Sequence, residues 1–150
     1  MVTTNSPPYF KRFYVCFDTL KRGWKVRCRP FIGLDDCFLK SPFKSEFLAA
    51  VGRDVNNQMF PIAWAMIEVE CTDSWVWFLS LLSADLGLED GYGYIIISDQ
   101  QKVSELTNLG LGLEIVISNI LLRVEHRNCV RHMFANWSGR KLGKSYEYEF

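Results

Sequence analysis

The feature that most constrains the fold is a pair of strand-like segments followed by an amphipathic helix. Residues 47–55 and 59–69 are rich in apolar side chains, and the polar triplet Asn56-Asn57-Gln58 separates them. Because asparagine tolerates the left-handed conformation of a tight turn, this pattern predicts a β-hairpin. Behind it, residues 72–74 offer N-cap oxygens, and apolar residues then recur at helical spacing up to Gly87: Trp75, Phe78, Leu79, Leu82 and Leu86. The sequence therefore predicts a helix packed on a sheet.

Further helices and strands are predicted on both sides of this hairpin and helix in the sequence. Apolar residues at three- and four-residue steps predict a helix from Phe10 to Arg22 that ends at Gly23. Three short runs suit strands and one suits a helix: strands at 31–39, 94–98 and 123–128, and a helix at 113–121. Strands and helices in this order predict an α/β fold with a central mixed sheet of five strands and helices on its faces.

Length and composition agree with one folded domain. The chain has 150 residues, of which 49% are hydrophobic and 23% charged, which excludes a wholly disordered chain. No apolar run approaches the roughly 20 residues of a membrane-spanning helix, and we expect neither a membrane association nor a signal peptide. The five cysteines are odd in number and widely spaced. Reduced thiols in an intracellular protein are therefore expected.

Charge is distributed unevenly although the formal net charge is zero. Residues 1–30 carry seven basic side chains and one acid, and residues 31–119 carry four basic side chains and thirteen acids. Residues 120–150 are basic again, with six basic side chains and three acids. An acidic centre suits metal ions and basic flanks suit phosphate, but solvated charge without a partner explains the same pattern.

Two aspartates follow predicted core strands and are candidate metal ligands. Asp35 follows Phe31-Ile32-Gly33-Leu34, and Asp99 follows Ile95-Ile96-Ile97-Ser98. If these strands are neighbours, the two carboxylates meet at one edge of the sheet and repel each other unless a proton or a cation lies between them. Oxygen ligands of this kind suit Mg²⁺ or Mn²⁺. The alternative is that each aspartate is only a cap or turn residue.

Cys129 and His132 form a second candidate site. Their spacing places both on one side of a helix predicted over residues 129–137. Zinc would accept both but needs further ligands, such as His126 and another cysteine. A cysteine-protease pairing with either histidine lacks a group that orients the base, so a buried thiol and a hydrogen-bonded imidazole are the simpler interpretation. The aromatic residues of 64–78 are interpreted as core: Trp64, Trp75, Trp77 and Phe78.

Eight stretches between residues 9 and 137 match one family pattern: 12–17, 28–35, 38–40, 49–54, 61–65, 74–75, 98–102 and 125–132. Through them, residues 9–137 resemble the catalytic core of plant Mutator-like element (MULE) transposases. The resemblance implies a ribonuclease-H-like fold and an Asp-Asp-Glu (DDE) triad that holds two divalent ions, Mg²⁺ or Mn²⁺. It assigns Asp35 and Asp99 as the first two catalytic, metal-binding acids, and Cys129 and His132 as the Cys-x-x-His motif of the family. It also implies DNA as partner, oligomers with full-length transposase, and a nuclear location.

The chain departs from the family pattern in several places. The third acid, a glutamate downstream of the Cys-x-x-His motif, has no counterpart; Glu147 and Glu149 follow His132 too soon to be assigned to it. Asp36 replaces the glycine that usually follows the first acid, and Ser41 and Ser45 stand where glycines are expected. Residues 103–111 are extra relative to the family and are predicted to form a loop.

These departures lead to a functional expectation with two alternatives. We expect residues 31–137 to be a truncated and inactive ribonuclease-H-like transposase core, preceded by a lead-in at 1–8 and a helical flank at 9–30, and followed by a divergent tail at 138–150. The first alternative is a domesticated fragment that binds DNA or protein. The second is a small metal-dependent nuclease, against which the missing third acid argues.

Overall fold

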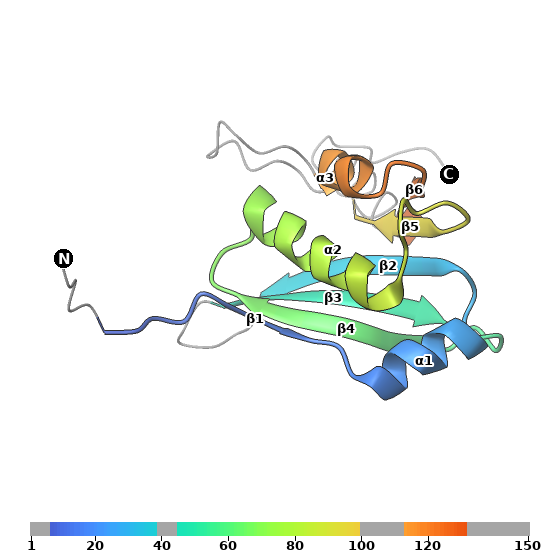
Figure 1. The fold of residues 1–150 in the computed structure, drawn as a ribbon, viewed down its shortest axis with the longest axis horizontal. Helices are drawn as coiled ribbons and strands as arrows, with labels where there is room; N and C mark the ends of the chain where they lie inside the picture. Colours follow the sequence, from blue (N-terminus) through green and yellow to red (C-terminus); the bar gives the residue numbers. More distant parts are fainter. Residues whose placement is uncertain (1–6, 39–44, 100–112, 132–150) are drawn as a thin grey trace, which may run out of the picture.

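The chain has a mixed α/β fold with a six-stranded sheet (Figure 1). The computed structural model describes residues 7–38, 45–99 and 113–131. The strands lie in the order β1-β4-β3-β2-β5-β6. Their bounds are Arg12–Val15 (β1), Phe31–Phe38 (β2), Glu46–Arg53 (β3), Met59–Ile67 (β4), Ile95–Ser98 (β5) and Glu125–Asn128 (β6). Three helices complete the described part of the chain: Asp18–Arg27 (α1), Thr72–Leu86 (α2) and Leu113–Ile120 (α3).

Strands β2, β3 and β4 form an antiparallel meander. The predicted hairpin between β3 and β4 is confirmed, and Asn57 takes the left-handed conformation with φ 63°. Side chains alternate between the two faces of each strand, so Ile32, Leu34 and Leu48 all lie on the buried face. The register shifts between Ala50 and Val51, because Ala50 lies opposite Ala63 and Val51 lies opposite Pro61.

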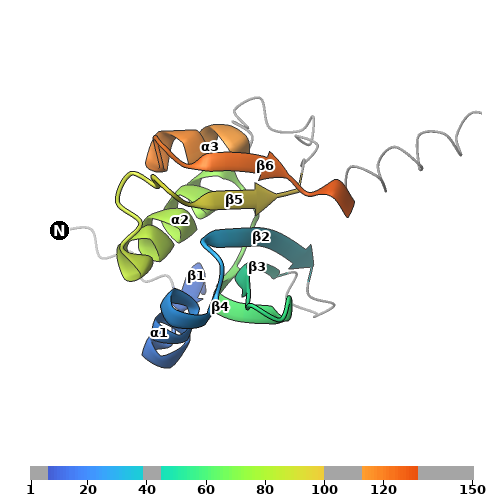
Figure 2. The ribbon, with the colours of Figure 1, turned by 90° about the vertical axis from the view of Figure 1, so that its right-hand side faces the viewer.

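Helix α2 covers the buried face of the meander (Figure 2). Phe78, Leu79 and Leu82 are fully buried, which confirms the predicted apolar face. The predicted N-cap is wrong: the cap position is Cys71, whose side chain makes no capping hydrogen bond to the helix backbone, and the Ser74 hydroxyl donates to the carbonyl of Val69. The helix ends where predicted because Gly87 adopts a left-handed φ of 65°.

The second half of the sheet is parallel. Strand β5 lies beside β2 and strand β6 beside β5, both in parallel register. Helix α3 connects them on the same side as α2, and the two helices pack against each other. The strands predicted at 94–98 and 123–128 and the helix predicted at 113–121 are therefore confirmed. The predicted loop at 103–111 and residues 132–137 of the last predicted helix lie outside the described residues.

The prediction of one helix from Phe10 to Arg22 is wrong. Residues 12–15 form β1, which extends the sheet from five predicted strands to six by pairing with β4. Helix α1 begins only at Asp18 and continues past Gly23 to Arg27. Gly23 is accommodated because the ring of Phe60 packs over it, 2.9 Å from the position that a Cβ would take. Tertiary packing outweighs the weak helix propensity of glycine here.

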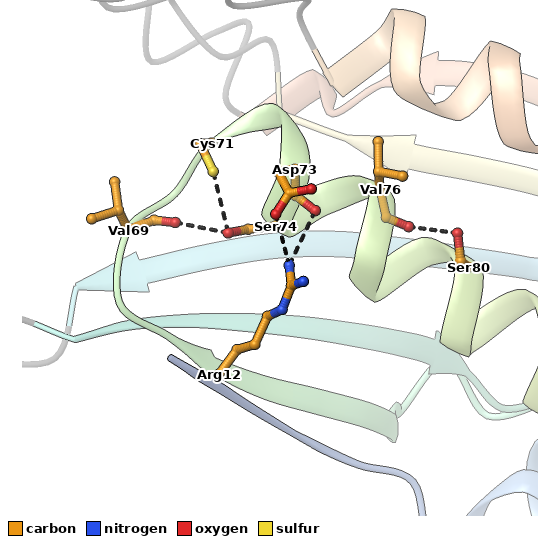
Figure 3. A network of polar contacts seen from close by, with 7 residues as sticks. All are labelled: Arg12, Val69, Cys71, Asp73, Ser74, Val76 and Ser80. Atoms are coloured by element: carbon orange, nitrogen blue, oxygen red, sulfur yellow. Dashed lines mark hydrogen bonds and ion pairs between the residues drawn. The ribbon is translucent and has the colours of Figure 1, made fainter. Parts of the chain in front are cut away.

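Polar side-chain contacts connect strand β1 with helix α2 (Figure 3). The guanidinium of Arg12 donates to the carboxylate of Asp73 at 3.0 Å and lies 4.7 Å from the ring centre of Trp77. The Tyr14 hydroxyl donates to Asp85 at 2.9 Å. Burial, together with the negative carboxylate beside it, raises the pKa of Tyr14. Arg12 and Tyr14 face α2, whereas Phe13 between them is exposed. This two-residue alternation is typical of a strand.

Other predictions from composition have mixed outcomes. All five cysteines are free thiols, as expected. Trp75 and Phe78 are core residues, whereas Trp64 and Trp77 are only half-buried. No helix in the described ranges is long and apolar enough to cross a membrane.

Candidate functional site

Asp35 and Asp99 occupy corresponding positions on neighbouring parallel strands. In the register of β2 and β5, Leu34 lies opposite Ser98. Asp35 and Asp99 are the next residues of these two strands, and adjacent strands lie about 4.8 Å apart. Parallel neighbours with corresponding positions present their side chains on the same face of a sheet. The topology therefore brings the two predicted acids to one edge, at the carboxyl ends of β2 and β5 (Figure 2).

Asp35 lies on the face of the sheet opposite α2. It is exposed, and its Oδ1 accepts a hydrogen bond from the backbone N–H of Asp36 at 3.0 Å. Two residues further on, burial raises the pKa of the Cys37 thiol, and the charges of Asp35 and Asp36 raise it further. The end of β2 is thus a region of negative potential, which favours cations.

Asp36 belongs to the other face of the sheet. It lies opposite Leu48 in the register of β2 and β3, and Leu48 is fully buried. Burial raises the pKa of Glu46, at the start of β3, and the charge of Asp36 adds to this effect. Asp36 therefore interacts with Glu46 across the α2 face, away from the side on which Asp35 lies.

Cys129 extends the row of strand ends by one strand. Ser98 lies opposite Asn128 in the register of β5 and β6, so Cys129 follows β6 as Asp99 follows β5. Its backbone N–H donates to the carbonyl of Ser98 at 2.8 Å. Its predicted partner His132 lies outside the described residues.

A polar pair that the motif analysis did not find lies beside this edge. Ser98 Oγ and His126 Nε2 are 2.7 Å apart and hydrogen-bonded, and both side chains are largely buried. The other ring nitrogen, Nδ1, lies 3.9 Å from Glu114 Oε1 of α3. The hydrogen bond with Ser98 engages Nε2 of His126, and Nδ1 is the ring nitrogen that faces Glu114.

The donor chemistry of the aspartate pair fits one hard divalent cation. Carboxylate oxygens are the preferred ligands of Mg²⁺ and Mn²⁺. Within the described ranges, no group of three or more His, Cys, Asp or Glu side chains is arranged to hold a metal ion. The aspartate pair therefore offers oxygen ligands of the kind that such an ion takes.

The fold and this edge define the class: a mixed α/β domain that presents two aspartates at the carboxyl ends of adjacent parallel strands. Residues 31–136, which span β2 to β6, match the MULE transposase domain. The chain belongs to this family. A comparison with curated protein sequences gave no match.

Proposed function

We propose that this chain is derived from the catalytic core of a DDE-type DNA transposase, that its sheet is ribonuclease-H-like, and that it is inactive in cleavage by itself. The observation that carries the proposal is the parallel register of β2 and β5, in which Leu34 lies opposite Ser98. Asp35 and Asp99 are the next residues along the chain. Membership of the MULE transposase domain family supports it. The antiparallel meander β2–β4, followed by parallel β5 and β6 with helices between them, is consistent with the proposed sheet.

In this proposal Asp35 and Asp99 share one Mg²⁺ or Mn²⁺ ion. When bound, such an ion polarises water and neutralises charge on a phosphate. Asp35 is oriented by the backbone N–H of Asp36. Asp99 follows a strand end that is held to β6 by the Ser98–His126 hydrogen bond and by the N–H of Cys129.

Inactivity follows from the number of ligands. The two-ion mechanism of phosphodiester cleavage needs side chains that place a second ion against the leaving oxygen. The described residues offer the aspartate pair without a third acid grouped beside it. A chain with such a pair is expected to keep the fold and its affinity for DNA while it lacks cleavage. We propose DNA as the partner and the nucleus as the location on the basis of the family.

The first prediction is that the 150-residue chain does not cleave supercoiled plasmid in Mg²⁺ or Mn²⁺. The measurement compares it with the Asp35→Ala, Asp99→Ala double variant by the conversion of supercoiled to nicked DNA. Neither protein is expected to nick above the protein-free control. Cleavage by the natural chain that the double variant loses would overturn inactivity and favour a small nuclease. Equal cleavage by both would place hydrolysis elsewhere and would contradict the assigned pair.

A further inference from the structure

The basic end of the chain plays no part in the proposed metal site of Asp35 and Asp99. Residues 1–30 carry seven basic side chains and one acid. The structure gathers part of this charge at the C-terminal end of α1. There the backbone N–H of Arg29 donates to the carbonyl of Arg53 at 3.1 Å, and Cys28 and Asp54 form an isolated β-bridge. Figure 1 shows this end of α1 beside the turn between β3 and β4. Arg53 is thus held beside the basic end of α1, from which it is far apart in sequence.

The four cations of this region are Lys25, Arg27, Arg29 and Arg53, which we call the basic surface. All four are exposed. The ion pairs of α1 involve its earlier residues instead: Lys21 pairs with Asp85, and Arg22 with Asp18. Within the described part of the chain, no carboxylate forms an ion pair with a member of the basic surface.

Ordinary structural roles account for only part of this charge. Lys25 and Arg27 lie in the last turn of α1, where cations stabilise the helix dipole. Arg53 donates one hydrogen bond to the carbonyl of Asn57 at 2.8 Å and keeps further donors. Arg29 has no such role. The nearest acid by register, Asp54, accepts the backbone N–H groups of Asn56 and Gln58 and thereby stabilises the turn.

We propose that the basic surface binds the phosphate backbone of duplex DNA. This inference rests on the proposed function for the choice of DNA and on charge complementarity for the surface. Exposed cations that form no ion pair release condensed counterions when they meet DNA phosphates, which drives binding that does not depend on base sequence. Arginine suits this role because its planar guanidinium matches phosphate geometry.

One short DNA duplex is long enough to reach from the basic surface to the aspartate pair. Arg29 and Asp35 are six residues apart, and the chain bends at Pro30 before β2 begins, so their backbones are separated by no more than about 20 Å. This corresponds to about six base pairs of duplex. A 20-base-pair duplex of arbitrary sequence is therefore long enough to contact the basic surface and to reach the acidic edge.

The experiment measures binding of a fluorescent 20-base-pair duplex to the whole chain by anisotropy, in EDTA, at several salt concentrations from 50 to 200 mM. The Arg27→Gln, Arg29→Gln double variant is compared with a matched Lys11→Gln, Arg123→Gln variant, which loses the same two charges elsewhere on the surface. Each phosphate contact contributes about 0.9 to the slope of log affinity against log salt. We expect the first variant to lose about 1.8 from this slope and the matched variant to keep the natural value.

A charge-preserving Arg27→Lys, Arg29→Lys variant is expected to retain most of the slope, which separates lost contacts from misfolding. Equal losses in both glutamine variants would overturn the proposal, because they would indicate a general charge effect. It would equally fail if the natural chain bound no duplex at 50 mM salt, or if the basic surface bound phosphatidylserine vesicles and no duplex. EDTA makes the result independent of any cation at Asp35 and Asp99, so this proposal and the proposed function fail separately.

Discussion

Glu46 is a carboxyl group that folding makes harder to ionise. Burial raises its pKa above the ordinary 4.5, and the neighbouring charge of Asp36 raises it further. Its Oε2 is buried without a hydrogen-bond partner in the described part of the chain. Above pH 4.5 the folded state therefore holds this proton more strongly than the unfolded state. Stability falls as pH rises from 4.5 through the raised pKa, and the penalty persists at higher pH.

Replacing Glu46 with glutamine is predicted to remove this penalty. The variant should be more stable than the natural chain at pH 7, and the difference should vanish below about pH 4, where the carboxyl is protonated in both states. Urea unfolding across this pH range measures the effect. In an Asp36→Asn background, Glu46→Gln should increase stability by less, because the charge of Asp36 no longer raises the pKa of Glu46. A gain that is constant with pH would refute the assignment of the penalty to ionisation.

The two groups at the strand ends differ in how far sequence could predict them. Asp35 and Asp99 each follow a run of apolar residues, and that local pattern, with the family resemblance, was enough to suggest that they meet. The Ser98–His126 hydrogen bond depends on the register between β5 and β6. No local pattern encodes that register, because each strand contributes only four residues. The pair became visible only in three dimensions.

Between elements, the contact of α1 with β3 depends on a glycine. Trp24 is buried, and its indole ring lies 2.7 Å from the position that a Cβ on Gly52 would take. The ring also stacks on Tyr94, with centroids 5.8 Å apart, so it has little room to move. Gly52 therefore provides the space in which α1 docks against the sheet.

Gly52→Ala is predicted to destabilise the chain by about 1–3 kcal/mol, the usual cost of overpacking a core. Gly33→Ala is the matched control in β2, where a Cβ would lie 3.2 Å from a methyl group of the half-buried Val51. That methyl group yields more easily than the indole, so the control should change stability by less than about 1 kcal/mol. Chemical unfolding of both variants checks the difference. Equal effects would contradict the proposed importance of the Trp24 contact.

The N-terminal elements were mispredicted because two periods overlap there. Phe10, Phe13, Tyr14 and Phe17 recur at helical steps, yet Arg12 and Tyr14 face α2 as alternate residues of a strand. Pairing with β4 decided between the two, and that is a tertiary effect which local periodicity does not contain. From β2 to β6, by contrast, no second period competes, and all elements were predicted within a few residues.

Over the whole molecule, charge is separated along the sheet. The basic surface lies at the start of β2, beside α1 and the β3–β4 turn. The aspartate pair lies past the other end of the β2–β5 register. The acidic middle of the sequence and its basic first 30 residues agree with this separation. The bridge between Cys28 and Asp54 and the hydrogen bond between Arg29 and Arg53 join Arg53 to the N-terminal charges. One end suits phosphate and the other suits a cation, which agrees with the proposed function of this MULE transposase domain.

The most direct test of this account is the binding of Mn²⁺, followed by the loss of the free-ion signal in electron paramagnetic resonance. The natural chain is predicted to bind one ion, and Asp35→Asn or Asp99→Asn is predicted to weaken binding by at least about tenfold. Asp36→Asn is the matched control, because it removes the same charge one residue away on the opposite face; it should change the affinity much less. Binding that survives both single substitutions, or that falls equally with Asp36→Asn, would contradict a shared site between Asp35 and Asp99.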